Sequence, residues 1–461
     1  MKKTVSTAMT ECRKQLCQNP GSVLREQIKD DEVDALWDQY RPNSRKRVFT
    51  PLLTLWTFLA QVLNADKTLE GAVTRAMASI KASGKKAASH DPSGYCKARY
   101  RLPIELLITL AHKTADILEQ KACKPYLWHD RHVLLVDGSS VSMDDSPANR
   151  KTYPQPPTQK KGCGFPVARI VGLFSLTTGA LVDLAIGSMA NAELALWQLL
   201  WKRLKPGDVV LADRLFGRYT DLCLLSARGI DLVARIDKTR KTDFRRGKRL
   251  GPNDHLVTWT KPKEKYSNRL SAAEWAKLPS EITLREVRYT LRTRGFRNKH
   301  IVLVTTLLDH ELYTAKDLAR LYGRRWEVET DFKHLKTSMA MDILHGRKPD
   351  MIQRELWTFM LAYNLVRTMM WQAAKQRHLN PLDISLAGAA HELLAVWPYT
   401  TLMTQEMLPA AYEQLLFLIG SHKIPHRPGR HEPRVQKRRH KDFDYMTRPR
   451  KSHRAEAVIV A

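Results

Sequence analysis

The segment Tyr322-Gly-Arg-Arg-Trp-Glu-Val-Glu-Thr-Asp-Phe-Lys-His-Leu-Lys336 decides how the rest of the chain is interpreted. Upstream of it, Thr314 and Asp317 match a capping box, which predicts a single helix from there to about Met339. At about 100° per residue, a stripe roughly 60° wide would then carry a carboxylate, two cations and a phenol. Its members are Tyr322, Arg325, Glu329 and Lys336.

An adjoining stripe of this expected helix is apolar and would face a core. Its members are Leu318, Leu321, Val328, Phe332, Leu335 and Met339. Gly323 inside the helix costs roughly 1 kcal/mol against Ala, unless something packs close to it. The alternative is an ordinary surface helix, whose charged pairs are worth a few tenths of a kcal/mol. The window alone leaves both interpretations open, and the decision depends on residues upstream.

Composition indicates a partner that is a polyanion. The chain of 461 residues has 76 Lys plus Arg against 47 Asp plus Glu, a formal charge of +29, which favours nucleic acid binding. No run of eighteen apolar residues and no signal-peptide order is present, so we expect no membrane span.

The six cysteines are scattered; Cys12 and Cys17 form one pair without a second. They are expected to be free thiols in a reducing cytoplasm.

The length predicts two to four domains. Residues 1–127 have apolar residues at helical spacing and basic segments such as Ser44-Arg-Lys-Arg47; either a DNA-end-binding domain or a structural helical cap fits. Residues 346–421 are helical and rich in Leu, Trp and Met, suitable for a core or for dimerisation. Residues 422–461 carry 12 Lys or Arg against 4 Asp or Glu and are expected to form a flexible basic tail.

Between these regions the pattern changes to strands that alternate with helices, which predicts a mixed α/β sheet. The expected strands are 132–137, 165–176, 180–186, 208–213 and 231–236, with helices at 192–204 and 219–227. Residues 238–300 are polar and basic, with strands expected at 255–261 and 282–292 in a smaller β-rich unit. A strand at 301–305 could close that unit or return to the main sheet.

Two aspartates share a context, since Asp137 and Asp213 each end an apolar strand, Val-Leu-Leu-Val-Asp and Val-Val-Leu-Ala-Asp. If these strands are neighbours, the carboxylates come together and Glu329 can complete the set. Three close carboxylates repel and need cations between them. Hard oxygen ligands suit Mg²⁺ or Mn²⁺, and two such ions about 4 Å apart would support phosphodiester chemistry.

Each aspartate also has an ordinary explanation, because Asp137-Gly138 is a common turn pair and Asp213 could cap the next helix. Other acidic residues compete for the same role from less suitable positions beside or within the strands. They are Asp144, Asp145, Asp183 and Asp208.

The order Asp137, Asp213, Glu329 resembles the DDE triad of cut-and-paste transposases. Tyr322-x2-Arg325-x3-Glu329-x6-Lys336 resembles the Tyr-Arg-Glu-Lys signature of bacterial insertion-sequence family four. Asp137-Gly138 and Asp213-Arg-Leu-Phe216 also resemble the blocks around that family's two aspartates.

This resemblance implies an RNase H-like catalytic core, here residues 128–345, with a β-rich insertion at 238–300. It implies Mg²⁺ or Mn²⁺ bound by the three carboxylates, nicking at transposon ends, a hairpin intermediate and strand transfer into target DNA. Double-stranded DNA would be the partner, bound by a homodimer associated with the bacterial nucleoid.

The remaining signature residues would contact DNA. Arg325 and Lys336 can bind phosphates beside the scissile bond, and Tyr322 can donate to another phosphate oxygen. A hairpin requires a flipped base, which a Trp of the insertion stacks in the family. Trp259 is the candidate here and Trp275 the second choice; packing within the insertion is the alternative for either.

Three functions remain in competition: an active transposase, a DNA-binding regulator that no longer cuts, and a metal-dependent nuclease that cuts without joining. The complete Asp, Asp, Glu set argues against the regulator. Incubation with Mg²⁺, a donor plasmid and a target would separate the nuclease from the transposase.

Overall fold

The computed structural model describes most of the chain, with gaps at its ends and in several loops. The described residues are 28–41, 48–82, 89–122, 126–263, 269–290, 300–400, 403–404, 406–425, 444–450 and 452. Cys12, Cys17, the basic segment at 44–47 and most of the expected tail lie outside them.

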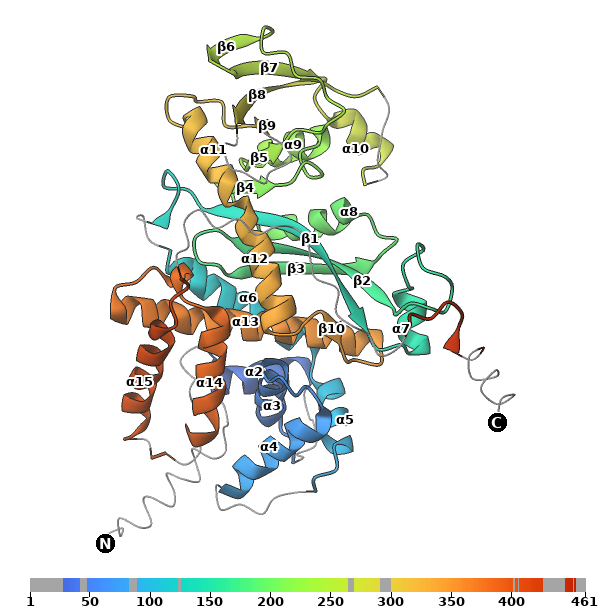
Figure 1. The fold of residues 1–461 in the computed structure, drawn as a ribbon, viewed down its shortest axis with the longest axis vertical. Coiled ribbons are helices and arrows are strands. Elements are labelled where there is room, and N and C mark those ends of the chain that lie inside the picture. The colour runs from blue at the N-terminus through green and yellow to red at the C-terminus, as the bar shows by residue number, and fades with distance from the viewer. Residues whose placement is uncertain are drawn as a thin grey trace.

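A large mixed sheet forms the centre of the fold (Figure 1). In the described residues its order is β3-β2-β1-β4-β5-β9-β8-β7-β6, with the short β10 paired to β1. Strands β1 to β3 are antiparallel, β4 and β5 run parallel to β1, and β9 to β6 are antiparallel again. The order 3-2-1-4-5 with these directions is the RNase H-like topology, so the expected fold class is confirmed. The strands are Val133–Met143 (β1), Val167–Ser175 (β2), Leu181–Ser188 (β3), Val209–Ala212 (β4), Asp231–Arg235 (β5), Lys248–Gly251 (β6), Asp254–Thr260 (β7), Glu281–Thr290 (β8), His300–Thr305 (β9) and Ile343–Leu344 (β10).

Helices precede, flank and follow the sheet. Those before it are Asp30–Tyr40 (α2), Pro51–Leu63 (α3), Leu69–Ala82 (α4), Ser93–Arg101 (α5) and Ile104–Gln120 (α6). Those between its strands are Pro147–Thr152 (α7), Glu193–Leu200 (α8), Tyr219–Ser226 (α9), Ala272–Lys277 (α10), Ala315–Gly323 (α11) and Glu327–Lys333 (α12). Those after it are Pro349–Arg377 (α13), Leu386–Thr400 (α14) and Leu408–Ser421 (α15).

The two faces of the sheet pack against different helices. Alternate residues of a strand point to opposite faces, and Leu135 and Leu211 belong to a core shared with α12 and α13. Leu134 and Val136 belong to a second core shared with α8 and α9. We call these sides the α13 face and the α8 face.

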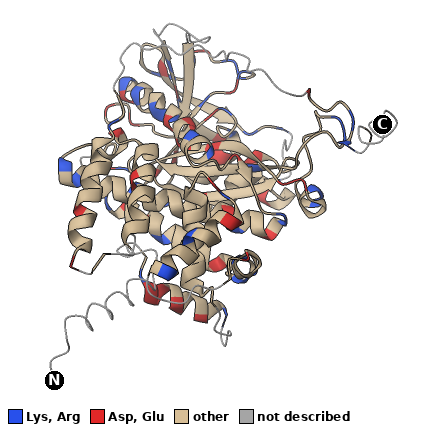
Figure 2. Cartoon of the chain, turned by 60° about the horizontal axis from the view of Figure 1, so that its bottom comes forward, with Lys and Arg blue, Asp and Glu red and all other residues tan. Residues whose placement is uncertain are grey.

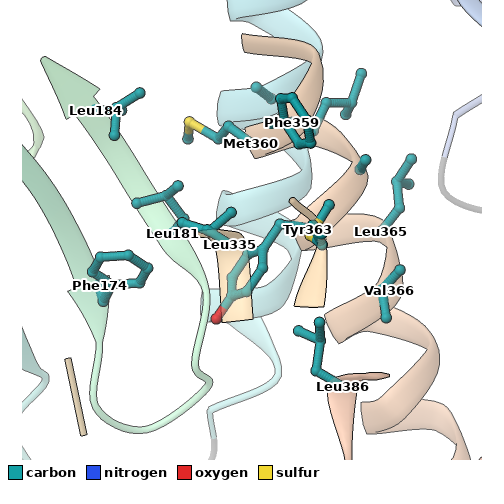
Figure 3. Close-up of a cluster of buried hydrophobic side chains, with 14 of the residues drawn as sticks. Phe174, Leu181, Leu184, Leu335, Phe359, Met360, Tyr363, Leu365, Val366 and Leu386 are labelled. Atoms are coloured by element: carbon teal, nitrogen blue, oxygen red, sulfur yellow. The ribbon is translucent and has the colours of Figure 1, made fainter. Parts of the chain in front are cut away.

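Helix α13 anchors the α13 face, and it is buried around most of its circumference. Its buried residues include polar ones such as Glu355, Asn364 and Arg367, so the helix lies inside the protein although it is not uniformly apolar. Figure 3 shows Met360 and Tyr363 of this helix directed towards the strands that carry Leu184, Leu181 and Phe174. The helical region at 346–421 therefore contributes directly to the core beneath the sheet.

The strands of the expected β-rich insertion continue the main sheet. Strand β9 pairs with β5 on one side and with β8 on the other. It thus does both things that the sequence left open: it returns to the main sheet and it closes the insertion. Because β8, β7 and β6 follow it in order, the insertion is joined to the core by backbone hydrogen bonds.

The prediction of a single helix from Thr314 to Met339 is wrong in detail. Thr314 caps its start by accepting a hydrogen bond from the Asp317 amide. The run is then divided into α11, a 3₁₀ turn at Arg324–Trp326, α12 and a π turn at His334–Ser338. A π turn takes an extra residue into the helix, as the hydrogen bond from the Met339 amide to the His334 carbonyl shows. Hydrophobic periodicity cannot detect such local changes of winding.

Gly323 ends α11 in an ordinary helical conformation, with φ −57° and ψ −33°. A Cβ built there would meet no atom within 4 Å, so no close packing explains the glycine. We therefore expect Gly323→Ala to raise the free energy of unfolding by about 0.5–1 kcal/mol. Urea denaturation of the two proteins would measure this, and a less stable variant would contradict it.

No helix among the described residues is both long and apolar enough to span a membrane. Figure 2 shows basic and acidic segments interspersed over the described helices and strands. Several basic stretches, including 427–441, lie outside the described residues, so the ribbon does not display all of the +29 charge.

Candidate active site

The two aspartates lie side by side on neighbouring parallel strands. Strand β1 pairs with β4 through Val133↔Val209 to Leu135↔Leu211, and two residues further along each chain come Asp137 and Asp213. Strand β4 ends at Ala212, one residue before Asp213, whereas β1 continues past Asp137 to Met143. The expectation that Asp137 ends its strand is therefore wrong: the segment after it stays paired with β2.

By strand alternation, Asp137 shares the side of Leu135, which faces α12 and α13. Its Oδ1 accepts a hydrogen bond from the Gly138 amide at 2.9 Å, and Asp213 Oδ1 accepts one from the Arg214 amide at 2.7 Å. Burial raises the pKa of Asp137, the Gly138 amide and Arg325 lower it, and the carboxylates of Asp213 and Glu329 raise it further. Asp137 therefore experiences the negative charge of both other carboxylates.

Helices α11 and α12 bring the Tyr-Arg-Glu-Lys residues to this edge. The Tyr322 hydroxyl donates to the Ala212 carbonyl at 3.3 Å, immediately before Asp213. Lys336 Nζ, in the π turn, donates to Ser139 Oγ at 3.3 Å, two residues after Asp137. The stripe predicted from the sequence thus touches both strands that carry the aspartates.

Arg325 lies between two of the carboxylates. Its guanidinium is 3.4 Å from Glu329 Oε1 and 3.8 Å from Asp137 Oδ2. The arginine side chain is only 8% exposed, whereas that of Glu329 is 49% exposed. A buried cation therefore partly neutralises the carboxylates, with Glu329 on the solvent side.

The sequence profile of the family described as "Transposase DDE domain" matches residues 128–365. The chain belongs to this family. It is 27% identical over 417 residues to the transposase InsG for insertion sequence element IS4 of Escherichia coli K12, covering 88% of this chain and 89% of that protein. This agrees with the resemblance to insertion-sequence family four, and the prediction that the chain is an enzyme of the transposase class is confirmed.

Two further similarities are more limited. The putative transposase InsL for insertion sequence element IS186A, also of E. coli K12, is 33% identical over 67 residues, 14% of this chain and 18% of that protein. The solved structure of the piggyBac transposase synaptic complex with hairpin DNA superposes with a TM-score of 0.47 at 9% identity. That superposition covers 87% of this chain and 85% of the piggyBac transposase chain.

The side chains of Asp137, Asp213 and Glu329 offer only carboxylate oxygens, which are the ligands that hard divalent ions such as Mg²⁺ prefer. Among the described residues, however, no three acidic, His or Cys side chains lie close enough to hold one ion together. Arg325 lies between Asp137 and Glu329, at 3.8 Å and 3.4 Å from their carboxylate oxygens.

Trp259 is not part of this group. It lies in β7, four strands from β4 in the sheet order, which is on the order of 19 Å at about 4.8 Å per strand. The side chain is 4% exposed, its Nε1 donates to Glu286 Oε1 at 2.8 Å, and Arg240 Cζ lies 3.7 Å from the ring centroid. Trp275, in α10, is half-buried.

Sequence reasoning missed Glu193, the first residue of α8. A Cβ built on Gly138 would lie 2.1 Å from Glu193 Oε1, so this carboxylate lies directly against the residue after Asp137. Burial raises the pKa of Glu193, Arg169 lowers it, and Asp137 and Asp213 raise it further. Nothing in the local sequence marks this glutamate; only its position at the start of the helix after β3 could have suggested it.

Proposed function

We propose that this transposase cuts an insertion sequence from donor DNA and joins it to target DNA, using Asp137, Asp213 and Glu329 to bind two divalent ions. The observation that carries the proposal is the pairing of β1 with β4, which aligns the two aspartates. The Tyr-Arg-Glu-Lys stripe lies against both strands, and the donor chemistry fits Mg²⁺, or Mn²⁺ in its place.

When bound, such ions would activate the attacking oxygen and stabilise the leaving oxygen of a phosphodiester. The chain's own residues prepare that site. Burial raises the pKa of Asp137, because a carboxylate is less well solvated inside the protein than in water, and the charges of Asp213 and Glu329 raise it further. A divalent cation beside Asp137 would relieve both effects. Arg325 places positive charge beside Asp137 and Glu329, and its guanidinium can bind a DNA phosphate through two parallel hydrogen bonds.

Lys336 and Tyr322 are proposed to hold the DNA backbone on either side of the aspartates. Lys336 is anchored at Ser139 by a 3.3 Å hydrogen bond and can exchange that neutral partner for a phosphate. The Tyr322 hydroxyl is bonded to the Ala212 carbonyl, so its contribution includes fixing the end of β4. Phosphate contacts of this kind position the DNA and do not read its sequence.

A hairpin intermediate is part of the proposal, with Trp259 stacking a flipped base. We further propose that the enzyme acts on double-stranded DNA as a homodimer, in the bacterial cytoplasm at the nucleoid. Residues 1–127 would bind transposon ends, and residues 346–421 would contribute to dimerisation.

The decisive experiment incubates the full chain with Mg²⁺, a donor plasmid carrying the element's ends, and a target plasmid. Excision followed by joined product supports the transposase. Cleavage without joining would indicate a nuclease, and binding of the transposon ends without cleavage would indicate a DNA-binding regulator. A parallel reaction with EDTA tests the requirement for a divalent ion.

DNA affinity should depend strongly on salt, because each DNA phosphate that the protein neutralises releases counterions. For duplex DNA the log–log slope is about −0.9 per neutralised phosphate. Deleting the residues after 421 should make the slope less negative by about 0.9 for every phosphate that the tail neutralises. Fluorescence anisotropy at several NaCl concentrations would measure this.

A tail of the same length with Gln in place of its 12 Lys and Arg provides the control for chain length. It should behave like the deletion. A slope unchanged in both proteins would mean that the tail does not touch DNA.

A further inference from the structure

Strand β4 leaves an opening in the sheet beside Asp137. Pairing between β1 and β4 reaches Leu135↔Leu211, and β4 ends one residue later at Ala212. On its other side, β1 remains paired with β2 as far as Ser142. The backbone at Asp137 and Gly138 is therefore covered by a strand on one side and lies beyond the end of β4 on the other.

Glu193 approaches this opening from the α8 face. Its helix packs on that face through Leu194, Leu196 and Trp197, and its carboxylate lies where a Cβ of Gly138 would be, 2.1 Å from Oε1 and 2.4 Å from Cδ. Any larger residue at position 138 would displace the carboxylate. The contact concerns space and not an unusual φ, and it involves only the end of the Glu193 side chain.

The start of α8 is held firmly. Arg169 Nη1 donates to the Asn191 carbonyl at 2.6 Å. The Asn191 side chain accepts hydrogen bonds from the amide and hydroxyl of Ser188 at 2.7 and 3.0 Å. These contacts connect β2 and β3 to the residues just before Glu193 and fix where its side chain begins.

The Glu193 carboxylate is half-buried, yet no described residue donates a hydrogen bond to it or pairs with it within 4 Å. It also lies close enough to Asp137 and Asp213 to interact with both. Asp137 Oδ1 accepts a hydrogen bond from the Gly138 amide. The carboxylates of Asp137 and Glu193 therefore both lie next to Gly138, on different sides of it.

We propose that Glu193 is a fourth carboxylate of the divalent-cation site, reaching it from the α8 face, opposite Glu329. This rests on the proposed function, since it assumes that Asp137 and Asp213 bind the ions. Unlike Glu329, which Arg325 holds at 3.4 Å, Glu193 has no arginine between it and the aspartates within ion-pair distance in the described structure. Two divalent ions carry four positive charges, which four carboxylates balance.

The test is Mn²⁺ binding to the full chain without DNA, by isothermal titration calorimetry, for wild type, Glu193→Gln and Asp137→Asn. Gln keeps the size of the side chain and removes its charge. Glu193→Gln should weaken binding by about tenfold to a hundredfold, and should raise the Mg²⁺ concentration needed for half-maximal nicking in the same direction. Thermal melting without metal checks that each variant is folded.

Glu327→Gln is the matched control, because Glu327 is also a half-exposed glutamate of the catalytic domain but pairs with Arg324 at 2.8 Å. Its Mn²⁺ affinity should equal that of wild type. If Glu193→Gln behaves like this control while Asp137→Asn loses binding, the inference about Glu193 is overturned and the proposed function stands. If Asp137→Asn also binds normally, the proposed carboxylate site itself fails.

Gly138→Ala supplies an independent check, because its methyl group must displace the Glu193 carboxylate. It should weaken Mn²⁺ binding as Glu193→Gln does. Combining the two substitutions should cost clearly less than the sum of their separate effects, since both act through one carboxylate. Full additivity would show that Gly138→Ala acts through Asp137 instead, and would count against Glu193.

Discussion

Asp137→Asn is expected to reduce the rate of strand cleavage at least about a thousandfold, equivalent to about 4 kcal/mol of activation free energy. The substitution keeps the shape of the side chain and removes the charge that lies level with Asp213 on the neighbouring strand. The same loss is expected for Asp213→Asn and Glu329→Gln. An end-labelled duplex carrying the transposon end, incubated with Mg²⁺, measures nicking directly.

Loss of folding would not explain this result, because the pKa of Asp137 is raised by burial and by its acidic neighbours. A raised carboxyl pKa means that, at neutral pH, ionisation costs more in the folded than in the unfolded chain. Ionised Asp137 therefore destabilises the folded chain at every pH above its pKa in the folded state. The destabilisation disappears as the pH falls below the ordinary carboxyl pKa of about 3.9. Without metal, Asp137→Asn should therefore be at least as stable as wild type at pH 7, as urea denaturation would show.

Glu327→Gln serves as the control for this series too, because its carboxylate pairs with Arg324 on the helix surface. It should nick at nearly the wild-type rate. DNA-end binding should survive in the three carboxylate variants, since the phosphate-binding cations remain. Near-normal cleavage by any one of these variants in Mg²⁺ would remove that residue from the proposed site.

The sequence was most informative where residues repeat with a regular period. The apolar runs before Asp137 and Asp213 identified β1 and β4, and their adjacency follows from the sheet order. The spacing of Tyr322 and Lys336 predicted that they share a stripe, and in the structure they contact residues next to Asp213 and Asp137, respectively. These features depend on local propensity and burial, which a sequence displays directly.

Features set by tertiary packing were not predictable in the same way. The continuation of β1 beyond Asp137 depends on its pairing with β2, whereas Asp-Gly in isolation favours a turn. The π turn that carries Lys336 has no periodic signature. Glu193 is near Gly138 only because α8 packs on the sheet, and no spacing along the chain records that contact.

For Trp259, the sequence identifies the type of side chain but not its surroundings in the fold. The sequence indicated an aromatic side chain inside the insertion, suited to stack a flipped base. In the structure the indole is 4% exposed and lies beneath the Arg240 guanidinium at 3.7 Å. A planar cation thus occupies a face that a base would need, so base capture requires Arg240 to move.

Trp259→Ala is expected to slow hairpin formation about tenfold to a hundredfold, because base stacking on an aromatic residue is worth about 1–3 kcal/mol. Nicking should be spared, since it precedes the step in which the DNA folds back. A time course that scores nick and hairpin separately measures both. The buried indole also contributes to packing, at about 3–5 kcal/mol for truncation to Ala, so the folded fraction must be measured alongside.

Two comparisons separate stacking from packing. A substrate with an abasic site in place of the flipped base should partly restore hairpin formation by Trp259→Ala, and no substrate can rescue a misfolded enzyme. Arg240→Gln removes the cation that covers the indole while keeping Trp259, and should form hairpins at least as fast as wild type. If Trp259→Ala forms hairpins at the wild-type rate while Trp275→Ala does not, the stacking role belongs to Trp275. In that case, Trp259 only packs against Glu286 and its neighbours.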